Sequence, residues 1–107
     1  MATSYIYCIK IHNTSWVKIG TTKNPEKRMK QYESYLPMGF DIIGYRKNAS
    51  YKMEAKLRKK LIDTGYAKTS NTEWLDTTLE KEEIIRILKL KKMDWKKSIF
   101  FYFFAWH

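Results

Sequence analysis

Two short apolar runs near the start of the chain are separated by turn-forming residues. The first, Tyr5 to Ile11, is rich in β-branched and aromatic residues, which favours a strand buried on much of both faces. His12 to Ser15 supplies turn chemistry, after which Trp16 to Ile19 resumes strand character and stops at Gly20. The pattern predicts a β-hairpin whose second strand ends in a tight corner at Gly20.

Further along, apolar residues recur at helical spacing in three segments. Asn24 is a good N-cap and Pro25 suits a first helical position, so we expect a helix from Pro25 to Tyr35 with Met29, Tyr32 and Leu36 facing inward. Ser50 is a candidate cap for a second helix. That helix should span residues 51–62, with Met53, Leu57 and Leu61 recurring every four residues, and a last helix should span residues 79–90.

Strand character returns twice between these helices. Residues 40–45 read as a third strand, although Gly44 weakens that strand, and residues 73–76 read as a short edge strand. We therefore predict a small α+β sandwich within residues 1–91, in which an N-terminal hairpin, a third strand and a short edge strand are flanked by about three helices.

The remaining residues, 92–107, differ in composition and form a basic and aromatic C-terminal tail. Its apolar run, residues 99–106, is far shorter than the roughly 20 residues that a membrane-spanning helix needs. The tail is expected either to pack on the domain or on a second copy, which would make a homodimer, or to bind a partner or a membrane interface. Among these possibilities, we do not expect association with a membrane.

Charge and residue counts narrow the function classes. The 107 residues carry 21 Lys and Arg against 11 Asp and Glu, a formal charge of +10, which favours a polyanionic partner. A single cysteine, Cys8, argues against disulfide scaffolds, and only two histidines, His12 and His107, argue against His-based metal clusters and Ser-His-Asp catalysis. The first residues lack the basic-then-apolar order of a signal peptide, so we expect an intracellular protein.

Several short motifs follow one another along the predicted strands and helices. Tyr5-Ile6-Tyr7 lies on the first strand, Lys18-Ile19-Gly20 on the second, Arg28 on the first helix and Glu54 on the second. This arrangement resembles the GIY-YIG nuclease superfamily over about residues 4–90. The most similar members are compact, single-domain proteins of phages, large DNA viruses and microbes that carry Lys-Ile-Gly in place of Tyr-Ile-Gly.

The resemblance implies a role for each matching residue. Glu54 would bind one Mg²⁺ or Mn²⁺, and Arg28 would stabilise the phosphate in the transition state. Tyr7 would hold or deprotonate the attacking water, with nearby Lys18 as the cation that lowers its pKa. Tyr32 would complete the hydrogen bonding, and Gly20 would let the chain turn closely beneath the site.

Two substitutions leave an alternative open. Tyr5 stands where the first motif has glycine, and Lys18 replaces a tyrosine that many members use near the water. The chain is then either a divalent-metal-dependent DNA endonuclease or a catalytically inactive nucleic-acid-binding module with the same fold. Individually, Tyr7 and Tyr32 are also explained as core aromatics, and Glu54 as a partner of Arg58 on its own helix.

Lysines outside the motifs complete the expected surface. Together they would follow a phosphate backbone with little base preference, so we expect structure-selective or weakly specific cutting of DNA, branched or damaged DNA among the candidates. Such cutting implies a role in DNA repair or recombination. We expect it in the cytoplasm or nucleus, or in the host cell of a virus. The candidate DNA-binding lysines are Lys23, Lys27, Lys30, Lys52 and Lys56.

Overall fold

The computed structural model describes residues 4–47, 50–63, 68–69 and 74–92. It is built around one antiparallel sheet with strand order β4-β5-β2-β1-β3-β6. The long central strands are β1 (Tyr5–Ile11), β2 (Trp16–Thr22) and β3 (Phe40–Lys47), and the short outer strands are β4 (Lys68–Thr69), β5 (Trp74–Asp76) and β6 (Lys91–Lys92). The predicted C-terminal tail lies outside the described residues from position 93 onward.

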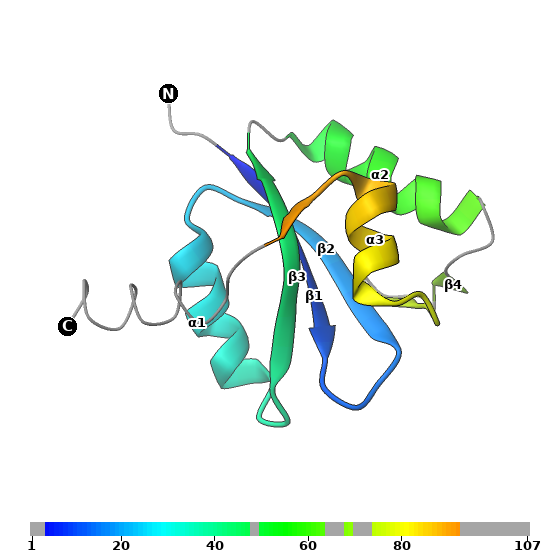
Figure 1. Cartoon of the computed structure of the whole chain (residues 1–107). Helices are drawn as coiled ribbons and strands as arrows, with labels where there is room; N and C mark the ends of the chain where they lie inside the picture. The colour runs from blue at the N-terminus through cyan, green and yellow to red at the C-terminus, as the bar shows by residue number, and fades with distance from the viewer. Residues whose placement is uncertain (1–3, 48–49, 64–67, 70–73, 93–107) are drawn as a thin grey trace.

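Three helices cover the sheet, with α1 (Pro25–Tyr35) on one side and α2 (Tyr51–Asp63) and α3 (Lys81–Leu88) on the other (Figure 1). The predicted α+β sandwich is therefore confirmed. Both predicted caps form as well. Asn24 accepts a hydrogen bond from the Lys27 amide at 3.1 Å, and the Ser50 hydroxyl accepts one from the Met53 amide at 3.2 Å.

Two apolar clusters, one on each face, hold the layers together. The cluster beneath α2 and α3 includes Ile6, Ile19 and Leu61, which are fully buried. The cluster beneath α1 contains Tyr7, Ile9, Met29, Tyr32 and Ile42. Because helices cover both faces of β1, its residues Ile6 to Ile9 are all buried, alternating between the two clusters, as the continuous apolar run predicts.

The structure departs from the prediction at the ends of elements. The last helix begins at Lys81 and ends at Leu88, two residues inside the predicted bounds at each end, since Lys89 adopts a left-handed conformation (φ 54°) that turns the chain into β6. The segment around Trp74 is a strand, but β4 pairs along its outer side, so β5 is not the edge of the sheet.

Both glycines that the sequence singled out lie inside strands. The predicted corner at Gly20 is wrong, because β2 continues through it to Thr22. Gly44 lies in β3, where an added Cβ would come within 2.7 Å of the Lys91 carbonyl oxygen and 2.9 Å of the Leu90 Cβ. Its missing side chain lets the segment that leads into β6 cross close to β3.

Candidate functional site

Tyr7 occupies a space that Gly20 leaves free. The two residues are direct partners in the β1–β2 ladder. A Cβ on residue 20 would lie 2.2 Å from the Tyr7 Oη and 2.4 Å from its Cζ, distances that real atoms do not allow. Gly20 therefore admits the phenol of Tyr7 across β2, and this is its structural role in place of the predicted turn.

The Tyr7 hydroxyl forms a buried hydrogen bond with Tyr32. Their Oη atoms are 2.6 Å apart, and the residues are only 4% and 5% exposed. The rings also meet edge to face, with centroids 5.8 Å apart. Since Tyr32 lies one helical turn after Arg28 on α1, the capped helix brings both residues to Tyr7.

Burial decides the protonation state of Tyr7. Desolvation raises the pKa of the phenol far above its ordinary value of about 10, and the hydrogen bond and charge of Tyr32 raise it further. The charge of Arg28 lowers the pKa and that of Glu54 raises it, but both effects are smaller. The expectation that nearby cations would lower this pKa is wrong: Tyr7 is a neutral hydrogen-bonding group.

A groove of about 240 Å³ opens beside this tyrosine pair. Lys18 extends from β2 into it, with its Nζ 5.5 Å from the ring centroid of Tyr32 and 5.8 Å from that of Trp74. Arg28 supplies a second cation from α1. The groove is lined by Lys18, Arg28, Gln31, Tyr32, Tyr35, Leu36 and Trp74.

Glu54 reaches the same end of the sheet from the opposite face. Its side chain is 18% exposed, and its Oε1 accepts a hydrogen bond of 3.0 Å from the Thr21 hydroxyl. Thr21 follows Gly20 on β2 and therefore points to the α2 side, whereas Tyr7 and Lys18 belong to the α1 side. The charge of Glu54 nevertheless makes a small contribution to the raised pKa of Tyr7 from across the sheet.

Arg58 accounts for only part of the environment of Glu54. Its Nη2 is 3.9 Å from Glu54 Oε2, a loose contact, and donates a hydrogen bond of 3.2 Å to the Ile19 carbonyl. A carboxylate offers about four lone pairs, so the Thr21 and Arg58 contacts leave Glu54 room for a cation. No three metal-ligating side chains come together within the described residues, and the donor set is this one carboxylate. Mg²⁺ accepts such a set when waters and substrate phosphates complete its coordination.

Both helices that carry these residues begin at this end of the sheet. Tyr5 pairs with Thr22 on one side and Lys47 on the other, so β2 and β3 end together, and α1 and α2 start shortly afterwards (Figure 1). Helix N-termini carry partial positive charge, which favours an anion here.

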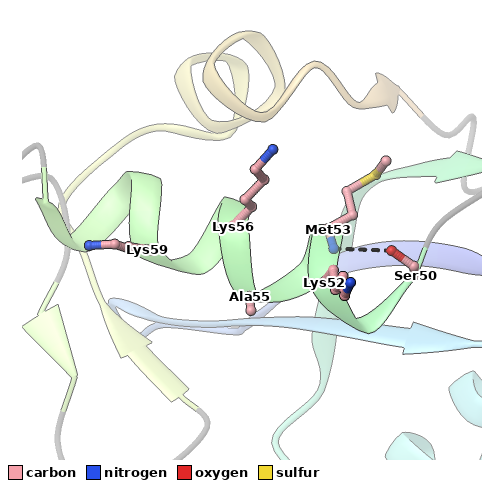
Figure 2. Close-up of a pocket in the computed structure, with 6 residues that line it drawn as sticks. All are labelled: Ser50, Lys52, Met53, Ala55, Lys56 and Lys59. Atoms are coloured by element: carbon pink, nitrogen blue, oxygen red, sulfur yellow. Dashed lines mark hydrogen bonds between the residues drawn. The ribbon is translucent and has the colours of Figure 1, made fainter.

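The candidate DNA-binding lysines fall on both sides of the sheet. Lys23, Lys27 and Lys30 are exposed on or just before α1, whereas Lys52 and Lys56 are exposed on α2. The α2 lysines border a shallow hollow of about 520 Å³ whose other lining residues are Ser50, Met53, Ala55 and Lys59. Figure 2 shows that Lys56 and Met53 rise from α2 in the same direction, next to the Ser50–Met53 hydrogen bond.

The structure brings several of the predicted site residues together, and sequence reasoning missed how some of them are held. Lys18, Arg28 and Tyr32 line one groove, and Tyr7 is hydrogen-bonded to Tyr32 behind it. Glu54 lies on the opposite face of the sheet. The support of Glu54 by Thr21 and the exposed ring of Tyr35 were not foreseen. Tyr35 does lie seven residues after Arg28, a spacing that places both on one helix face.

Among the described residues, no helix is long and apolar enough to span a membrane. A family model, the T5orf172 domain, matches residues 4–92. It describes a phage-associated domain with a nuclease-like fold. No match was found among curated proteins or among solved structures.

Proposed function

Since the chain belongs to the T5orf172 domain family, which indicates a nuclease-like or DNA-binding role, we propose that it is a divalent-metal-dependent DNA endonuclease. The observation that carries this proposal is the buried Tyr7–Tyr32 hydrogen bond at the wall of a groove that also holds Lys18 and Arg28. A core tyrosine needs no cations beside it, whereas phosphodiester hydrolysis needs polar groups of this kind around the phosphate.

The residues of the groove have distinct tasks in this proposal. Arg28 binds the phosphate and stabilises the charge that develops on it, because a guanidinium presents several donors in a fixed plane. Lys18 supports the same phosphate as a point charge. Tyr7 and Tyr32 position the attacking water through their linked hydroxyls, and the raised pKa of Tyr7 makes it a hydrogen-bonding partner of that water and not its base.

Glu54 is the residue that would hold the cation. Mg²⁺ or Mn²⁺, when bound, supplies a water of lowered pKa and neutralises charge on the phosphate. Thr21 orients the carboxylate of Glu54 for this task, as outer hydrogen bonds commonly do for metal ligands. The exposed lysines on both sides of the sheet bind the DNA backbone without reading its sequence, so cutting would be weakly specific or structure-selective, as repair or recombination requires.

A second candidate is a catalytically inactive nucleic-acid-binding module. It is favoured by the contacts of Glu54 with Thr21 and Arg58, which give the carboxylate a structural role between β2 and α2 that needs no metal. In that case Lys18 and Arg28 anchor phosphates, and the C-terminal tail serves assembly of a homodimer or attachment to a partner. The two candidates differ in their need for metal.

The deciding experiment is nicking of supercoiled plasmid and of a branched DNA with Mg²⁺ or Mn²⁺. We expect cleavage by the unaltered protein and a loss of at least 100-fold in Glu54→Gln, with DNA binding retained. Glu33→Gln is the matched control, because it removes the same charge from an exposed position on α1. If the unaltered protein binds both DNAs and cuts neither, and Glu54→Gln binds equally well, the inactive module replaces the endonuclease.

A further inference from the structure

The groove beside Tyr32 combines cations with aromatic rings. Lys18 and Arg28 provide the charges, and Tyr32, Tyr35 and Trp74 provide the rings. Tyr32 is held by Tyr7 and meets the edge of Phe40, so its ring is fixed in the core. Tyr35, in contrast, is 74% exposed, so most of its ring faces solvent at the groove.

Such a combination matches the chemistry of an unpaired nucleotide. Single-stranded nucleic acids bind where cations follow the backbone and aromatic rings stack on the faces of the bases. In a duplex those faces are covered by the neighbouring base pairs, and only base edges and phosphates are offered. Rings in a groove therefore gain nothing from a fully paired helix.

The size of the groove agrees with a single base. Its volume of about 240 Å³ is slightly below the roughly 300–1,000 Å³ of drug-sized ligand pockets. A double helix cannot enter it. One planar base is small enough to do so.

We propose that this groove binds one unpaired nucleotide of the DNA, with its base against Trp74 and Tyr35 and its phosphate at Lys18 and Arg28. The inference extends the proposed function by naming the substrate class: DNA with an unpaired or extruded base next to the bound phosphate. Base recognition of this kind requires neither metal nor Glu54, so it holds for the endonuclease and for the inactive module alike.

The test is DNA binding by the full chain in EDTA, measured by fluorescence anisotropy. The three probes are a perfect duplex, the same duplex with one added unpaired base, and that bulged duplex with an abasic residue at the unpaired position, which has the same number of phosphates as the second probe. We expect the unpaired base to bind at least 10-fold more tightly than the other two. Loss of one base–aromatic stack weakens binding roughly 5- to 150-fold in proteins that bind single-stranded nucleic acids.

Variants locate the effect in the groove. Tyr35→Leu and Trp74→Leu should lose the preference for the unpaired base while binding to the perfect duplex stays within twofold. Trp74→Phe, which keeps an aromatic ring, should retain most of the preference for the unpaired base. Tyr51→Leu is the matched control, because Tyr51 is as exposed as Tyr35 but lies on α2.

Equal affinity for all three probes would overturn the inference, as would an equal loss on all probes in Tyr35→Leu. Neither result affects the nicking experiment, which depends on metal and on Glu54. A nicking failure with a retained base preference would instead reject the endonuclease and keep the nucleotide groove.

Discussion

At the scale of single residues, the neutral phenol of Tyr7 shapes both the site and its response to pH. Burial and Tyr32 raise its pKa well above 10, whereas an unfolded chain leaves a tyrosine near 10. The hydroxyl of the folded protein therefore stays protonated above the pH at which an exposed tyrosine ionises. It is available as a donor and acceptor, and the hydroxyl that it meets on Tyr32 is fixed by the same hydrogen bond.

This raised pKa predicts an alkaline loss of stability. Below about pH 10 the phenol is protonated in both states, and its contribution is fully present. As the pH rises above 10, Tyr7 releases its proton in the unfolded chain but keeps it in the folded protein. The free energy of unfolding therefore decreases with rising pH until the higher pKa of the folded state is reached. We expect Tyr7→Phe to flatten this decrease in urea unfolding between pH 8 and pH 11. The exposed Tyr51→Phe should leave it unchanged, and an identical slope in Tyr7→Phe would contradict the assigned environment.

At the scale of elements, the N-terminus of α1 determines where the groove residues lie. Asn24 accepts from the Lys27 amide and Pro25 occupies the first helical position, so the helix begins at a defined residue and presents Arg28 and Tyr32 one turn apart. We expect Asn24→Ala to lower the free energy of unfolding by about 1 kcal/mol, the typical cost of a lost cap. Urea unfolding measures it. Asn24→Asp should restore the cap, and equal losses in both variants would show that the side-chain hydrogen bond contributes nothing.

The same element scale explains what the sequence could predict. Caps, helices and central strands follow from local signals, because Asn24, Ser50 and the apolar run of β1 act within a few residues. Strands β4 and β6 have two residues each and carry no periodicity of their own; they form only because β5 and β3 offer free edges.

The features of the candidate site fall into the same two groups: those that local signals predict and those that depend on pairing between elements. Tyr7, Arg28, Tyr32 and Glu54 are candidates because their order and spacing resemble the motifs of a nuclease superfamily, and the fold places each on a regular element. Pairing across the sheet could not be predicted in this way. The room that Gly20 gives Tyr7, and the bond from Thr21 to Glu54, depend on the register of β2 and on the packing of α2.

At the scale of the whole molecule, the exposed lysines lie on both faces of the sheet around the end where α1 and α2 begin. Lys27 belongs to one face and Lys52 to the other. If DNA crosses this end, both lysines should neutralise phosphates and release counterions on binding. The logarithm of the binding constant then falls with the logarithm of salt concentration by about 0.9 for each phosphate contacted.

Lys27→Gln and Lys52→Gln should therefore each reduce that slope by about one, without changing the free energy of unfolding by more than about 0.5 kcal/mol. Lys10→Gln is the matched control, because this substitution removes the same charge near the other end of β1. Anisotropy titrations of a perfect duplex between 50 and 200 mM salt give the slopes. A change in Lys27→Gln alone would confine DNA to the face that carries α1 and its groove. Glu54, on the opposite face, would then lie away from the bound DNA backbone. That result would contradict a DNA-binding surface on both faces and would also argue against an endonuclease that uses Glu54.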